Sequence, residues 1–129
     1  MAEGLLDEAV SHLEFLGYTI TRNEDSTWAR HSVKLNILLK VFRGGLLMTS
    51  FLRADETAKT DRPGFLDFVN KLNEQAAVTR FYADSDGDLA METWYPEGAY
   101  ERIRFGHFLS LRESDIERIR GLEGRSYLE

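Results

Sequence analysis

The sequence contains no cysteine, which excludes disulfide bonds, thiol nucleophiles and cysteine metal ligands. Its apolar runs are about three residues long, whereas a membrane-spanning helix needs roughly 20 apolar residues. Residues 1–4 show neither the basic stretch nor the apolar stretch with which a secretion signal begins. These absences predict a cytoplasmic protein without a membrane anchor.

Catalytic sequence motifs are also missing. The chain has no G-x-S-x-G nucleophile motif and no glycine-rich phosphate loop. Its three histidines, His12, His31 and His107, could together hold zinc, but none has the short spacing of a metal motif. Ser110 and Glu113 have the spacing of a helix capping box, which explains this serine better than a nucleophile does. We therefore predict that the protein is not an enzyme and has no metal or cofactor.

The composition is that of an ordinary globular protein, with 43% apolar and 29% charged residues. A chain of 129 residues is close to the usual size of one domain, so we expect a single domain over residues 1–129. The net charge is −6, and residues 65–129 hold most of it, with eight Lys or Arg against thirteen Asp or Glu. This negative charge disfavours binding to nucleic acid or to anionic lipid.

The stretch from Thr79 to Tyr95 has the strongest local signal. Aromatic and apolar runs flank the segment Asp84-Ser85-Asp86-Gly87-Asp88, as expected for a β-hairpin with an Asp-Gly turn. The three aspartates resemble a calcium loop, but an EF-hand needs its glycine at the sixth position and helices on both sides. A turn therefore explains the segment better than a calcium site.

The first half of the chain predicts a helix followed by strands. Apolar residues recur at three- and four-residue steps from Leu5 to Leu16, and Gly17 can end this helix. Residues 18–21 predict a short strand, and strand structure resumes at Thr27 after a turn at 23–26. Residues 33–41 alternate between apolar and polar, which predicts a strand paired through a Gly44-Gly45 loop with residues 46–52.

The first hairpin carries apolar residues on both of its faces. If Gly44-Gly45 forms the loop, Leu38 lies opposite Phe51 and Phe42 lies opposite Leu47. One face meets the core, and the other needs a cover from this domain or from another chain. Leu38, Phe42, Leu47 and Phe51 are therefore the predicted partner or dimer surface.

Residues 53–61 predict a loop, and a central helix follows it. Asp61 can cap this helix, Pro63 suits its first turn, and Phe65, Phe68 and Leu72 keep helical spacing. Residues 97–109 predict irregular structure, and a short last helix is expected to begin at the capping serine described above. The predicted order is α-β-β-β-α-β-β-α, an α+β two-layer sandwich with an antiparallel sheet.

This order is similar to the type III secretion chaperone-like fold, and within it the chain resembles the YbjN family of small bacterial proteins. The resemblance covers about residues 5–120 and is carried by Leu16-Gly17-Tyr18, by the segment 65–73 (FLDFVNKLN) and by the segment 81–89 (FYADSDGDL). It implies a cytoplasmic, non-enzymatic and often dimeric protein that is linked in some cases to regulation. The related secretion chaperones bind partner polypeptides.

We therefore predict a protein-interaction module that binds another polypeptide or a second copy of itself. The alternative is a small-ligand-binding regulatory domain, with a pocket between the sheet and the central helix lined by Tyr82 and Trp94. A further possibility is single-stranded nucleic acid, because basic and aromatic residues alternate on the first hairpin. The net negative charge favours a protective role for these basic residues: Arg30, Lys34, Lys40, Arg43 and Arg53, interleaved with Trp28, Phe42 and Phe51.

Overall fold

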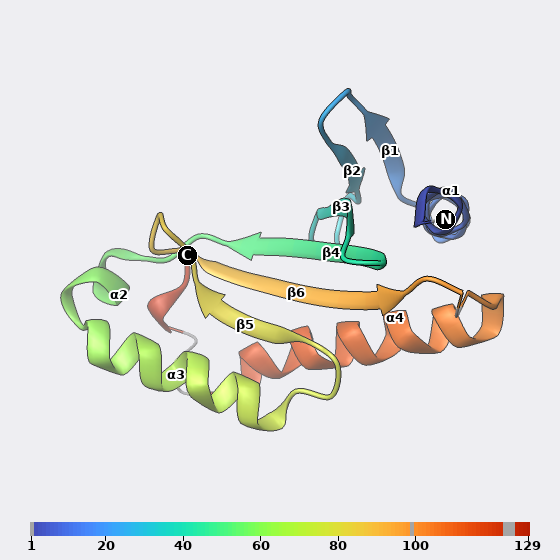
Figure 1. Cartoon of the computed structure of the whole chain (residues 1–129). Coiled ribbons are helices and arrows are strands. Elements are labelled where there is room, and N and C mark those ends of the chain that lie inside the picture. The colour runs from blue at the N-terminus through green and yellow to red at the C-terminus, as the bar shows by residue number, and fades with distance from the viewer. Residues whose placement is uncertain (1, 99, 123–125) are drawn as a thin grey trace. The chain divides into compact units, whose positions relative to one another are not determined.

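The computed structural model describes residues 2–98, 100–122 and 126–129 (Figure 1). It is an α+β protein in which six strands form one sheet of order β1-β2-β3-β4-β6-β5. The elements in chain order are α1 (Ala2–Phe15), β1 (Thr19–Arg22), β2 (Thr27–Arg30), β3 (Ile37–Phe42), β4 (Gly45–Leu52), α2 (Glu56–Thr60), α3 (Arg62–Gln75), β5 (Arg80–Ala83), β6 (Leu89–Pro96), α4 (Arg102–Glu117) and a 3-10 turn, Arg118–Gly121.

The contacts within the chain divide it into two compact units. The first unit comprises Met1–Ser50 and Thr93–Gly106, and the second comprises Phe51–Glu92 and His107–Glu129. The boundary falls within β4, β6 and α4. The expectation of a single domain stays a prediction.

In the first unit, α1 packs beside β1 and β3. Four residues of its predicted apolar stripe are buried, Leu5, Ala9, Val10 and Leu13, whereas Leu16 is 40% exposed. The helix ends at Phe15, and Gly17 after it has a φ of 98°, which is accessible to glycine at little cost. Strands β1 to β4 pair antiparallel through successive hairpins. The core face of this sheet consists of Ala29, Ile37, Leu39, Leu46 and Met48, each 2% exposed or less.

In the second unit, α3 runs beside β5 (Figure 1). The cap, the proline and the apolar spacing that predicted this helix have the positions expected of them. The carboxylate of Asp61 accepts a hydrogen bond from the amide of Gly64, at 3.2 Å, and Pro63 lies in the first turn. The residues at helical spacing are buried: Phe65, Phe68, Val69 and Leu72. The hairpin of β5 and β6 is antiparallel, with its turn at residues 84–88, and this prediction is confirmed.

The strand structure predicted from Thr27 to residue 41 is interrupted at residues 31–36 and forms two strands, β2 and β3, so four strands rather than three precede α3. His31 explains the difference, because its Nδ1 atom accepts hydrogen bonds from the amides of Val33 and Lys34 at 3.1 and 3.2 Å. These bonds fold residues 31–34 into a local turn that competes with strand pairing. The side chain of Val33, predicted to lie on the apolar face of this strand, is 85% exposed.

The predicted pairing of the first hairpin is wrong by two residues. Phe42 lies opposite Gly45, and Leu38 lies opposite Thr49, so the loop is Arg43-Gly44. Both loop residues have positive φ, 47° and 76°, as a two-residue hairpin turn with the right twist requires. A shift of two keeps each side chain on its predicted face, because strand side chains alternate with a period of two.

Two further predictions about helices are corrected. The segment 53–61, predicted to be a loop, contains the short helix α2, and the carboxylate of Asp55 caps it by accepting from the amide of Thr57. The segment 97–109, predicted to be irregular, contains the start of α4 at Arg102. Ser110 therefore lies inside a helix and does not cap one.

Candidate functional site: an aromatic and basic sheet face

The first unit has a second sheet face, opposite the face on which α1 packs. Strand alternation places Trp28, Leu38, Phe42 and Leu47 on it, and the pairing aligns Trp28 with Leu38 in one row. Trp28, Leu38 and Phe42 are half-buried, and Leu47 is 9% exposed. We call this surface, together with Trp94, the tryptophan face.

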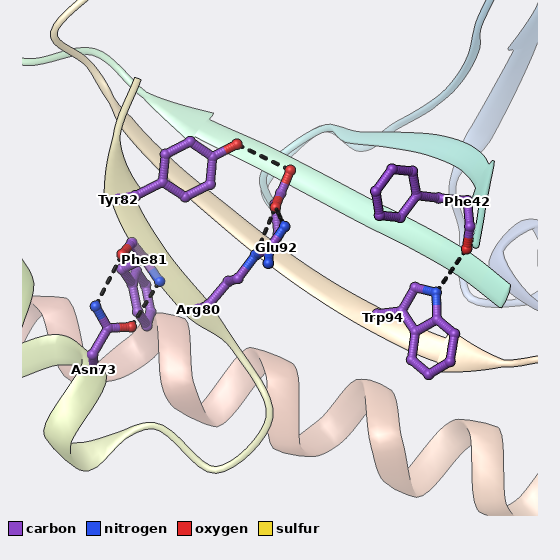
Figure 2. Close-up of polar contacts among 7 residues, drawn as sticks. All are labelled: Phe42, Asn73, Arg80, Phe81, Tyr82, Glu92 and Trp94. Atoms are coloured by element: carbon purple, nitrogen blue, oxygen red, sulfur yellow. Dashed lines mark hydrogen bonds and ion pairs between the residues drawn. The ribbon is translucent and has the colours of Figure 1, made fainter. Parts of the chain in front are cut away.

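Trp94, on β6, joins this face by lying over Gly45. A Cβ atom at residue 45 would lie only 2.6 Å from Cε2 of the indole, so the glycine leaves the space that the ring fills. The indole N–H donates a hydrogen bond of 2.8 Å to the carbonyl oxygen of Phe42 (Figure 2). This bond holds the ring in place even though 42% of Trp94 is exposed.

Three basic side chains lie over the rings of the face. The guanidinium of Arg30 lies 5.3 Å from the ring centroid of Trp28, and that of Arg43 lies 5.3 Å from the centroid of Phe42. The ammonium of Lys40 is 6.0 Å from the same Phe42 centroid. Distances of this size allow cation–π attraction, so positive charge is held directly above apolar surface.

The structure brings together three of the four predicted surface residues. Leu38, Phe42 and Leu47 share the tryptophan face, whereas Phe51 belongs to the second unit and is 43% exposed there. The role of all four as a partner surface stays a prediction. The contribution of Trp94 was missed, because it depends on which strand lies beside β4, and sequence periodicity does not contain that information.

Of the basic residues that alternate with aromatics in the sequence, Lys34 lies outside the strands and Arg53 belongs to the second unit. The three histidines are also divided: His12 and His31 lie in the first unit, and His107 lies in the second. No group of three or more histidine, aspartate or glutamate side chains suited to a metal occurs in residues 2–98, 100–122 and 126–129. The same part of the chain has no helix with the length and apolarity to cross a bilayer.

His12, on α1, contacts two aromatic side chains, Phe105 and Tyr100. Its ring packs edge-on against Phe105 with the centroids 5.2 Å apart, and its Nδ1 atom lies 3.5 Å from the hydroxyl of Tyr100. A Cβ atom at Gly106 would lie 3.6 Å from this ring, which is an ordinary contact distance. Burial, and then the positive charge of Arg102, lower the pKa of His12 below its ordinary value of 6.5.

The second unit carries a polar cluster on one face of its hairpin (Figure 2). Glu92 is 8% exposed, and it accepts hydrogen bonds from the guanidinium of Arg80 and, at 3.0 Å, from the hydroxyl of Tyr82. Burial and the bond to Glu92 raise the pKa of the Tyr82 hydroxyl above 10.0.

Phe81 points to the buried face beside α3, so strand alternation turns Tyr82 away from that helix. The alternative pocket between sheet and α3 therefore loses Tyr82 from its predicted lining.

Two aspartates of the second hairpin accept hydrogen bonds from backbone amides. The carboxylate of Asp84 accepts hydrogen bonds from the amides of Asp86 and Asp88, at 2.9 and 3.0 Å, and closes the turn. The carboxylate of Asp88 accepts from the amide of Ala54 at 2.8 Å. Gly87 adopts a φ of 86°, which explains why glycine is needed in the turn.

Asp115 on α4 is a buried acidic residue that the sequence analysis missed. It is 2% exposed, and its two oxygens accept hydrogen bonds from three successive amides, those of Ala77, Val78 and Thr79, at 2.8 to 3.0 Å. These amides follow the end of α3, so the carboxylate fixes the passage from α3 to β5. This role is structural.

Comparisons with known proteins show which solved structures have a similar fold. No protein-family profile matches the chain, and no curated protein matches its sequence. The structure is similar to a crystal structure of YbjN from E. coli, described as a candidate transcription regulator, with a TM-score of 0.72, 14% identity, and 96% of this chain and 95% of that chain covered. It is also similar to a chain of the heterodimeric ExoU-SpcU complex from the type III secretion system of Pseudomonas aeruginosa, with a TM-score of 0.59, 16% identity, and 88% and 96% covered. The fold is YbjN-like, which confirms the predicted fold resemblance.

Proposed function

We propose that this protein is a non-enzymatic, cytoplasmic interaction module that binds another polypeptide through its tryptophan face, as a regulator or a chaperone-like binder. The observation that carries the proposal is the arrangement of Trp28, Phe42 and Trp94 on the sheet face opposite α1. Large aromatic side chains of this kind supply most of the energy at protein interfaces. The hydrogen bond from the Trp94 indole fixes one such ring before binding, which lowers the entropy cost of association.

The similar folds support the same class of function. E. coli YbjN is described as a candidate transcription regulator, and the ExoU-SpcU structure is a complex of two proteins. The partner of the present chain would contact the tryptophan face as a segment of another protein. Self-association through the same face is the alternative arrangement.

The test is an array of short peptides that sample all residue types, probed with the labelled full-length chain. We expect the wild type to bind a subset of the peptides and Phe42→Asp to lose that binding, because a carboxylate replaces an apolar anchor. Val33→Asp is the matched control, since Val33 is 85% exposed and lies outside the face. Melting curves of both variants establish that they fold.

The proposal fails if the wild type binds no peptide, or if Phe42→Asp binds as well as the wild type. Should Phe42→Asp not fold, Phe42→Ala replaces it, because it removes the same half-buried anchor without burying a charge. That variant must then reduce binding. A dimer in sedimentation that Phe42→Ala dissociates would instead assign the face to a second copy and overturn binding of another protein.

A further inference from the structure

The charges around the tryptophan face indicate the chemistry of its partner. The first unit as a whole is close to neutral, with seven Lys or Arg and eight Asp or Glu residues. Six of these charges lie on two opposite faces, whereas Arg22 pairs with Asp7 of α1 at 2.8 Å and the amide of Glu97 donates to the carbonyl of Gly44. Three exposed acidic residues, Asp7, Glu8 and Glu14, lie on α1, which packs on the core face. The positive charges of Arg30, Lys40 and Arg43 lie on the opposite face.

We propose that the tryptophan face binds an acidic segment of another protein, in which Asp or Glu residues alternate with apolar ones. This inference rests on the proposed function and names the class of partner. The apolar residues of the segment would contact Trp28, Phe42 and Trp94. Its carboxylates would pair with the three cations, which lie over the rings and so stand beside any apolar group placed there.

Arg43 gives a separate reason to assign its charge a role in binding. It occupies a turn position with a φ of 47°, where asparagine or glycine would be less strained. The chain thus holds an arginine where the backbone favours another residue, and its guanidinium lies over Phe42. A contribution from the side chain to binding accounts for a residue that the turn itself does not favour.

Single-stranded nucleic acid is the competing ligand for a basic and aromatic surface. Bases bind such surfaces by stacking on open ring faces. The net charge of −6 repels a strand that carries one phosphate per nucleotide, whereas a short acidic peptide carries less charge and adds apolar contacts. The observations therefore favour the peptide.

The two tryptophans of the chain both lie on this face, so intrinsic fluorescence reports its occupation directly. The probe is a synthetic peptide of about ten residues, roughly 33 Å when extended, that alternates glutamate with leucine and phenylalanine and lacks tryptophan. We expect a saturable change of emission that weakens with added salt. A peptide with lysine in place of each glutamate, one with serine instead, and an oligothymidylate of similar length are the comparison ligands.

The decisive variant is Arg30→Glu/Lys40→Glu/Arg43→Glu, which we expect to lower the affinity for the acidic peptide at least about tenfold. Arg53→Glu/Lys59→Glu/Lys71→Glu makes the same change of charge at exposed positions of the second unit and should stay within about twofold of the wild type. Arg43→Asn should raise thermal stability yet weaken binding. A merely structural role for Arg43 would not separate these two effects.

The proposal is overturned if the serine or lysine peptide binds as tightly as the acidic one, or if both triple variants weaken binding equally. If the serine peptide binds and this binding needs Phe42, the charge inference fails and the proposed function stands. If only the oligothymidylate binds, both fail. Should the decisive triple variant not fold, Lys40→Glu alone must weaken binding of the acidic peptide and leave binding of the serine peptide unchanged.

Discussion

Gly45 is the position at which a single methyl group tests how the tryptophan face is built. A Cβ atom there would lie 2.5 Å from the carbonyl oxygen of Tyr95 and 2.6 Å from Cε2 of Trp94. Comfortable contacts between such atoms are about 3.5 Å, so Gly45→Ala must displace the backbone or the indole by roughly 1 Å. The backbone oxygen cannot move as a flexible side chain does, and the substitution is therefore costly.

The expected cost follows from two contributions. Overpacking of this kind costs about 1–3 kcal/mol, and loss of the hydrogen bond from Trp94 to Phe42 costs about 1 kcal/mol. The sum of about 2–4 kcal/mol corresponds to a decrease in melting temperature of roughly 8–16 °C for a chain of this size. Thermal unfolding followed by tryptophan emission measures both the stability and the environment of the ring.

Gly44→Ala is the matched control for Gly45→Ala. Gly44 has no atom within 4 Å of its would-be Cβ, but its φ is 76°, so alanine there suffers only backbone strain of about 1–2 kcal/mol. We expect a smaller loss of stability and an unchanged Trp94 environment. If Gly45→Ala costs less than Gly44→Ala and leaves the emission spectrum unchanged, the proposed packing of Trp94 over Gly45 is refuted.

Three further predictions concern structural residues. Asp115→Asn should destabilise the protein by about 2–4 kcal/mol in urea unfolding, because at least one of the three amides after α3 loses its acceptor; a loss below about 1 kcal/mol would contradict this. The lowered pKa of His12 means that the unfolded state binds the proton more tightly, so stability should fall as the pH drops below 6.5, and a His12→Gln variant that shows the same fall would disprove the assignment. Asn73→Ala removes two hydrogen bonds to the backbone of Phe81 and should speed amide exchange in β5, whereas Asn70→Ala on the same helix should not.

Local signals predicted the elements whose stability is local. The helix α3 was found because Asp61 caps it, Pro63 opens it and its apolar residues keep an unbroken spacing. The second hairpin was found because its turn depends on Asp84 and Gly87, which lie next to each other in the folded loop. In both cases the residues that decide the structure lie within a few positions of one another.

Predictions failed where distant residues decide the structure. The buried side of α4 includes Arg112 and Asp115, so its sequence lacks the apolar periodicity that predicts a helix. Asp115 is buried because it accepts hydrogen bonds from amides 36 to 38 residues earlier. Gly45 was assigned to the loop because paired glycines suit a turn, but it lies in β4, where Trp94 needs the space. Neither requirement can be read from neighbouring residues.

The candidate site was likewise predicted where it depends on neighbouring residues and missed where it depends on distant ones. Its apolar residues on β3 and β4 were predicted from strand alternation, and the error of two residues in pairing left their face unchanged. The ring of Trp94 and the placement of cations over individual rings depend on tertiary contacts, so only the structure could supply them.

Nuclear magnetic resonance of the two indole N–H groups during titration with the acidic peptide shows whether an acidic segment binds at the tryptophan face. Trp28 and Trp94 are the only tryptophans, so each gives one assignable signal. Binding at the tryptophan face should shift both signals in proportion to saturation and leave the amides of the turn at residues 84–88 in place. Saturating binding that moves those amides while both indole signals stay fixed would place the peptide elsewhere and rule out the tryptophan face as its binding surface.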